Sequence, residues 1–150
     1  MKAAPTLDGR VRIDPESELD LIVLRSIIPD AQGNGEALAA RLGTGMDPSA
    51  SEDWEDFVKP DLEEQFNQQV LTVAGVLAEA KPGVPLFIGK EDSDSWYGAL
   101  NQARLALHDQ HGFDDEEELE EMSEERAAAR IRSHFYQVLQ GLLLDVLMFP

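Results

Sequence analysis

Apolar side chains recur at helical spacing in three long segments of the chain, residues 61–81, 92–111 and 123–148. Spacings of three and four residues gather such side chains on one face of a helix, and that face must be covered by other elements. In the first segment the stripe consists of Leu62, Phe66, Val70, Val73 and Leu77. The three long helices are therefore expected to form the core of a mainly α protein.

Shorter elements are expected around these helices. Residues 9–14 alternate apolar and charged side chains and residues 85–89 are nearly all apolar, so both are predicted as strands that pair in a two-stranded antiparallel β-ribbon. Asp14 is expected to cap a following helix, Pro29 to end it, and Pro60 to separate two later helices. The additional helices are predicted at residues 15–28, 34–42 and 52–58.

The length of 150 residues fits one domain, and a hydrophobic content of 43% is enough for a core. The predicted fold is a single helical domain over residues 1–150, a compact bundle of about five or six helices with the small ribbon. No secretory signal is apparent in the first residues, and no apolar run is long enough to span a membrane. We expect a cytoplasmic protein.

Twelve basic residues stand against 30 acidic ones, which gives a net charge of −18. Such a surface repels phosphate backbones and anionic lipids, so neither direct nucleic-acid binding nor membrane binding is expected. A protein partner with a basic patch fits the charge. An acidic mimic of nucleic acid is also physically allowed, although a solvated acidic surface is the commonest meaning of such a composition.

The densest charge lies in residues 114–125, where nine of twelve residues are acidic. Like charges four residues apart oppose helix formation, so residues 113–122 are predicted to be a mobile acidic connector. The most exposed candidates for contact with a basic partner are Asp114, Asp115, Glu116, Glu117 and Glu118. A plain linker is the simpler interpretation of the same residues.

The segment SWYGALNQARLALHDQHGF, residues 95–113, combines aromatic, basic and histidine side chains. On a helix, Trp96, Leu100, Ala103 and Leu107 share one face, which indicates core packing. His108 and His111 are three residues apart and could face one ligand, but a metal site needs three or four ligands at defined spacing. We expect no metal, no cofactor and no catalytic residues, and we keep a metal- or small-molecule-binding protein using His108 and His111 as an alternative.

The C-terminal helix carries a predicted stripe of Ile131, Phe135, Val138, Leu142, Val146 and Phe149. Beyond Val138 the helix is apolar on nearly all sides, so it is expected to be sandwiched by other helices or buried in a homodimer interface. Asp145 falls near this stripe, where burial would demand a partner such as Arg104 or Arg25.

One segment supports a family resemblance. The pattern W-x-x-A-L-N-x-x-R-L-x-L, followed by an acidic gap and a helix with paired aromatics, resembles the C-terminal half of the AosR-like family, small bacterial proteins long catalogued as a domain of unknown function. The family-like positions are Trp96, Ala99, Leu100, Asn101, Arg104, Leu105 and Leu107.

Known AosR-like members include an oxidative-stress regulator that acts through cysteines and a sigma factor, and members are often encoded near a protease adaptor. The resemblance therefore implies a regulator with a transcription- or proteolysis-related partner. This chain has no cysteine, so thiol sensing does not carry over. We predict a non-enzymatic regulatory or adaptor protein that acts through protein–protein interaction.

Overall fold

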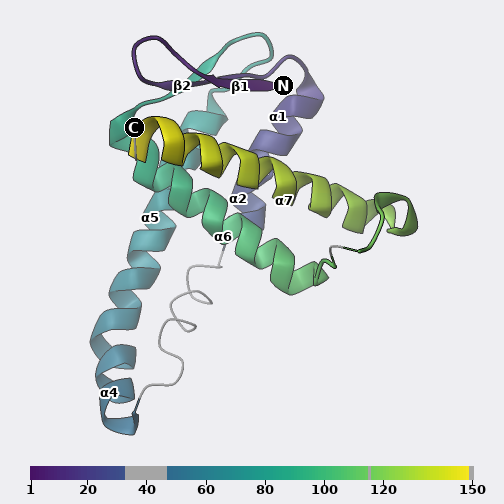
Figure 1. Cartoon of the computed structure of the whole chain (residues 1–150). Coiled ribbons are helices and arrows are strands. Elements are labelled where there is room, and N and C mark those ends of the chain that lie inside the picture. Colours follow the sequence, from purple (N-terminus) through teal and green to yellow (C-terminus); the bar gives the residue numbers. More distant parts are fainter. Residues whose placement is uncertain (33–46, 115, 149–150) are drawn as a thin grey trace.

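The computed structural model describes residues 1–32, 47–114 and 116–148. A small sheet lies at one end of a set of packed helices (Figure 1), so the prediction of a mainly α fold is confirmed. The strands and α-helices are β1 (Lys2–Pro5), β2 (Val11–Asp14), α1 (Glu18–Arg25), α2 (Ile27–Ala31), α4 (Pro48–Asp53), α5 (Lys59–Ala78), β3 (Leu86–Ile88), α6 (Ser93–His111) and α7 (Glu124–Leu143). Among the described residues, no helix is both long and apolar enough to cross a lipid bilayer.

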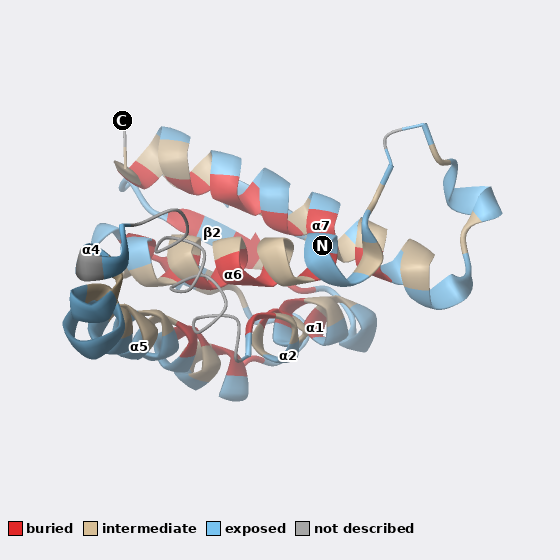
Figure 2. Ribbon diagram, turned by 90° about the horizontal axis from the view of Figure 1, so that it is seen from below, coloured by how far each residue is buried: buried red, intermediate tan, exposed pale blue. Residues whose placement is uncertain are grey.

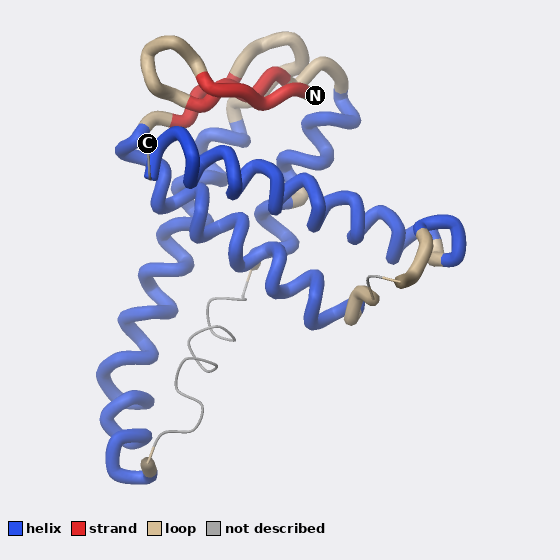
Figure 3. Tube along the Cα trace, in the orientation of Figure 1, coloured by secondary structure: helices blue, strands red, loops and turns tan. Residues whose placement is uncertain are grey.

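The sheet, red in Figure 3, has three antiparallel strands in the order β1-β2-β3. The prediction of a two-stranded ribbon is therefore wrong in the number of strands. The predicted pairing of the other two strands is found, with Val11 opposite Ile88. On the other edge of β2, Ala3 of β1 lies opposite Ile13. The sequence KAAP of β1 was missed because it is short and mostly exposed, and it has no alternation of apolar and charged residues.

The first predicted helix, 15–28, is divided in two. Asp14 ends β2, and α1 is capped by Ser17, whose hydroxyl accepts a hydrogen bond from the Asp20 N–H at 3.3 Å. Ser26 lies between the two helices. Its hydroxyl donates to the carbonyl of Ile22 at 2.6 Å, and such a side-chain bond competes with the backbone hydrogen bonds of a helix. The expectation that Pro29 ends the helix is wrong, because a proline is tolerated in the first turn of a new helix, here α2.

The predicted break at Pro60 is also wrong. A π-helical turn, Trp54–Val58, joins α4 to α5, and the N–H of Lys59 bonds to the carbonyl of Trp54 across five residues. Pro60 then lies in the first turn of α5, where its missing N–H costs little. The first half of the joined helix extends beyond α6 and α7 (Figure 1). The predicted helix 34–42 lies outside the described residues.

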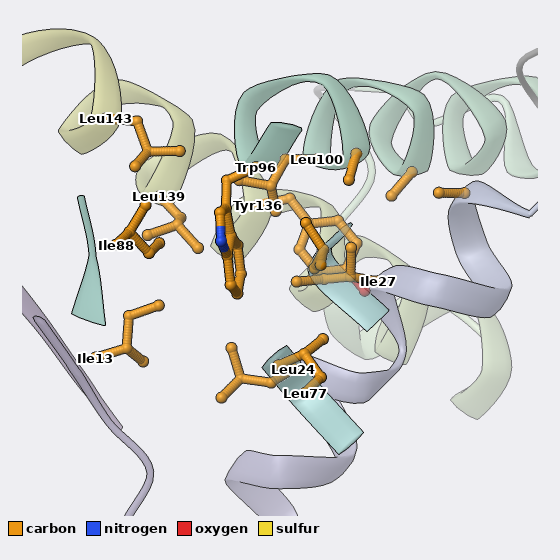
Figure 4. Close-up of a cluster of buried hydrophobic side chains, with 14 of the residues drawn as sticks. Ile13, Leu24, Ile27, Leu77, Ile88, Trp96, Leu100, Tyr136, Leu139 and Leu143 are labelled. Atoms are coloured by element: carbon orange, nitrogen blue, oxygen red, sulfur yellow. The ribbon is translucent and has the colours of Figure 1, made fainter. Parts of the chain in front are cut away.

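Helix α6 is the centre of the packing, because α2, α5 and α7 all contact it. The predicted core of three long helices is thus extended by α2 and by one face of the sheet. Figure 4 shows how side chains from all these elements meet around the indole of Trp96. The labelled members of this cluster are Ile13, Leu24, Ile27, Leu77, Ile88, Trp96, Leu100, Tyr136, Leu139 and Leu143.

The fully buried face of α7 differs from the predicted stripe, of which Phe135, Leu142 and Val146 are only partly buried against the core. Ala129, Tyr136, Leu139, Leu143 and Leu147 are buried, whereas Ile131 is 55% and Val138 53% exposed. In Figure 2 the buried residues of α7 lie on its side toward α6. The apolar pattern of the sequence did not indicate this buried face, because the face also contains two polar residues. These are Ser133 and Gln140, which are buried and hydrogen-bonded to α6.

Candidate functional site

The acidic connector, residues 113–122, joins α6 to α7 and is held at its base by two arginines of α7. Arg126 donates to Glu117 with Nη2 and Oε2 2.5 Å apart, and also to the carbonyls of His111 and Gly112. Arg130 donates to the carbonyl of Asp114 at 3.2 Å. Of the five predicted contact residues, Asp115 lies outside the described residues, and the predicted mobility of the connector stays a prediction.

Most carboxylates of this region are free. Their side chains are exposed, and within the described part of the chain they make no hydrogen bond or ion pair. These carboxylates are accessible to an outside partner, whereas Glu117 is paired with Arg126. The free side chains are those of Glu116, Glu118, Glu120, Glu121, Glu124 and Glu125.

An apolar hollow lies beside these acids, where the connector faces α7. Its volume is about 370 Å³, and Leu119 and Ile131 supply its apolar lining, 47% and 55% exposed. Glu117, Glu118, Arg130 and His134 complete the rim. Sequence reasoning found the acids but not the hollow, because its two apolar residues come from different elements.

The three histidines of the chain come together at the same end of the molecule. The ring of His108 meets Phe113 edge-on at 5.3 Å, and the ring of His111 stacks on Phe113 at 5.6 Å. His108 and His134 line a second hollow of about 120 Å³. No group of three metal-ligating side chains occurs among the described residues. Both predicted histidines pack against the ring of Phe113, and a ligand-binding role for them stays a prediction.

A partly buried polar network joins α2 to α7, and no pattern in the sequence had indicated it. Arg132 donates to both oxygens of Asp30, with Nε–Oδ2 2.8 Å and Nη2–Oδ1 3.1 Å, and the Tyr136 hydroxyl donates to Oδ2 at 2.7 Å. Burial, then the hydrogen bond to Asp30, raises the pKa of the Tyr136 phenol well above its ordinary value. The hydrogen bond to Asp30 also raises the pKa of Arg132.

The family-like motif of α6 packs into the core and bonds to α7. Trp96, Leu100 and Leu107 are at most 2% exposed, so this face of α6 lies in the core. Arg104 donates to Gln140 Oε1 at 2.6 Å, and the Gln140 amide donates to the carbonyl of Tyr97 at 3.4 Å. Together these bonds join α6 to α7 within the core.

Asn101, the remaining polar residue of the motif, is half-buried. It lines a hollow of about 290 Å³ between α5 and α6, with Phe66 and Gly98 among its neighbours. The motif therefore packs the centre of the fold and leaves one amide at the edge of a cleft.

The predicted partner for Asp145 is not found. Asp145 is exposed, on the turn that follows α7. Arg104 is bonded to Gln140, and Arg25 donates to the carbonyls of Leu77 and Ala80. The expectation of a buried carboxylate is therefore wrong: Asp145 itself is exposed, although the neighbouring Val146 is partly buried against the core.

A protein-family model described as "Domain of unknown function (DUF2017)" matches residues 3–147. No curated protein matches the chain, and no solved structure matches it.

Proposed function

The chain belongs to the DUF2017 family, and from that premise we propose that it is a non-enzymatic regulatory or adaptor protein of the cytoplasm that acts by binding another protein. The likeness of its α6 segment to AosR-like members supports a regulatory role with a transcription- or proteolysis-related partner. Without cysteine, the chain would carry out that role by contact alone and not by thiol oxidation.

The observation that carries this proposal is the group of free carboxylates beside an apolar hollow. Arg126 anchors the connector through Glu117, so the neighbouring acids are presented next to Leu119 and Ile131. Charged groups around a small apolar centre are typical of protein-binding surfaces, with the charges steering association and the apolar centre supplying affinity. A partner with a basic patch complements this surface.

The test begins with a pull-down from the source organism's lysate, with the purified chain as bait and washes at low and high salt. Mass spectrometry of the eluates identifies any protein retained in stoichiometric amount. We expect one partner that is lost at high salt, since exposed charge pairs are screened by salt. A blank at both salt concentrations would overturn the proposal.

Two matched variants locate the contact. One carries Glu116→Gln, Glu118→Gln, Glu120→Gln and Glu121→Gln in the connector. The control removes as many exposed charges from α4, the π-helical turn and the first half of α5, by Glu52→Gln, Asp53→Asn, Asp56→Asn and Glu64→Gln. We expect the connector variant to lose the partner and the control to retain it. Equal retention by both variants would remove the connector from the binding surface.

A further inference from the structure

We propose that the exposed side of α7 is a docking surface for a basic amphipathic helix of a protein partner. The surface, called here the α7 stripe, consists of Ile131, Phe135, Val138 and Leu142. The inference rests on the proposed function and names the chemistry of the partner.

Two of the four stripe residues are exposed beyond what the core uses, while Phe135 and Leu142 pack partly against the core. The opposite side of α7 is already filled, with Tyr136, Leu139 and Leu143 fully buried. Ile131 and Val138 are more than half exposed, and Phe135 and Leu142 are half-buried. A surface helix normally needs one apolar face, so a second row of partly exposed apolar side chains is where we place the partner.

The geometry of the stripe fits a helix. Ile131, Val138 and Leu142 are separated by seven and four residues, which places them on one side of α7. From Ile131 to Leu142 the axial distance is about 16 Å at the rise of an α-helix, or roughly three turns of a partner helix. At its N-terminal end the stripe opens into the hollow between Ile131 and Leu119, which can accept an apolar side chain of the partner.

The charges around the stripe select a basic partner. The three arginines of α7 are used within the chain, Arg126 by Glu117, Arg130 by the Asp114 carbonyl and Arg132 by Asp30. Glu118, beside the hollow, is free.

Both ends of the stripe are acidic as well. Glu124 lies two turns before Ile131 on the same side of α7, and the exposed Asp145 follows Leu142 by three residues. A helix with lysine or arginine along its edges would therefore meet unpaired carboxylates at both ends of the stripe.

A second copy of this chain is a poorer occupant. Each copy carries a net charge of −18, and a symmetric contact through α7 would bring the free glutamates of both copies toward each other. Like charges in an interface are strongly unfavourable, so the apolar contact would have to overcome that repulsion. A basic helix gains both the apolar contact and the charge pairing.

The test uses two synthetic peptides of about 14 residues, long enough to span the stripe as a helix. Both are composed of leucine and lysine, one ordered so that the leucines fall on one helical face and the other scrambled. Calorimetric titration of the full chain gives the affinity, and circular dichroism reports helix formation in the peptide. We expect the amphipathic peptide to bind about tenfold or more tightly than the scrambled one.

Matched variants separate the stripe from general charge attraction. Ile131→Ser with Val138→Ser removes the most exposed side chains of the stripe without changing the net charge. The control, Ile22→Ser with Leu71→Ser, removes comparably exposed apolar side chains from α1 and α5. We expect about tenfold weaker binding for the stripe variant and no change for the control, with both variants folded because all four positions are exposed.

Three results would overturn the inference. They are equal affinity for the ordered and scrambled peptides, unchanged affinity in the stripe variant, or a dimer in sedimentation velocity that Ile131→Ser with Val138→Ser dissociates. The last would assign the stripe to a second copy. The proposed function is tested separately by the pull-down from lysate. A partner that binds the parent chain but not the connector variant would still support that function if any of these three results were obtained.

Discussion

At Asp30 a single carboxylate joins α2 to the last long helix of the fold. Its two oxygens accept hydrogen bonds from Arg132, and one of them also accepts the Tyr136 hydroxyl at 2.7 Å. These partners are 102 and 106 residues away along the chain. No local pattern relates residues at such separation, so the network was outside the reach of sequence reasoning, which assigned Asp30 to the residues after a helix end.

The Tyr136 phenol is predicted to keep its proton as long as the chain is folded. Its pKa is raised above the ordinary value of 10.0, because burial disfavours the phenolate and the hydroxyl donates to Asp30. Since the folded pKa lies above the unfolded one, the stabilisation is complete below pH 10 and is lost as the pH rises beyond it. We expect phenolate absorbance of Tyr136 to appear only together with loss of helical circular dichroism.

The variant Tyr136→Phe identifies the signal. It should abolish the component of the titration that coincides with unfolding and leave the contribution of Tyr97, the other tyrosine of the chain. Ionisation of both tyrosines while the helical signal remains native would contradict the prediction.

The hydrogen bonds of Asp30 are predicted to contribute more to the free energy of unfolding than those of an exposed ion pair. Asp30→Asn leaves the Arg132 guanidinium without its carboxylate in a largely buried position, and we expect a loss of about 2 kcal/mol in the free energy of unfolding. The control is Asp14→Asn, which breaks the exposed pair between Asp14 and Arg12 and should cost under ~0.5 kcal/mol. Urea denaturation followed by circular dichroism measures both, and equal costs would contradict the prediction.

At the scale of elements, two glycines test how α6 and α7 are built. Gly112 ends α6 in the left-handed region at φ 56°, and its N–H bonds to the His108 carbonyl. A side chain is strained there, so Gly112→Ala should lower the free energy of unfolding by about 1 kcal/mol. Gly141 lies inside α7 with open space around it, and Gly141→Ala should raise the stability by up to ~1 kcal/mol through helix propensity. Thermal melts of the two variants should shift in opposite directions, and shifts of the same sign would refute this account.

The elements that sequence reasoning placed well are those with local end signals. The range 92–111 differs by one residue from α6, which ends before Gly112, and α7 begins after Ser123, whose hydroxyl accepts from the Arg126 N–H. The errors in helix ends arose where a proline was read as the end of one helix although it lies in the first turn of the next. Pro29 and Pro60 indicated helix ends, yet each fits the first turn of a following helix.

The face of α7 shows why the candidate site was only half predicted. A stripe of large apolar residues was assigned to the core, but Ser133 and Gln140 lie on the buried side because His108 and Arg104 satisfy them. Only the fold shows that Ile131 remains outside and lies next to Leu119. The acids of the connector were visible in the sequence, and the apolar half of the surface was not.

At the scale of the whole molecule, the 30 acidic residues far outnumber the 12 basic residues that could pair with them. The ion pairs found among the described residues are mostly part-exposed, such as Arg10 with Asp8 and Lys59 with Glu55. Pairs of this kind contribute between zero and about 1 kcal/mol each. A net charge of −18 on 150 residues leaves most carboxylates repelling one another. We therefore expect repulsion to outweigh attraction in the surface electrostatics of the folded state.

Salt is consequently predicted to stabilise this protein. Ions screen the long-range repulsion between unpaired carboxylates more than they weaken the few short contacts, so the folded state gains as the Debye length shrinks. We expect the melting temperature to rise by roughly 2–4 °C between low and moderate sodium chloride, equivalent to about 1 kcal/mol for a chain of this size. The variant Glu118→Gln, Glu120→Gln and Glu121→Gln should melt higher than the parent at low salt and respond less to added salt, because the connector holds the densest charge. A melting temperature that falls with salt in both proteins would mean that the ion pairs, and above all the largely buried pair of Arg132 with Asp30, outweigh the repulsion.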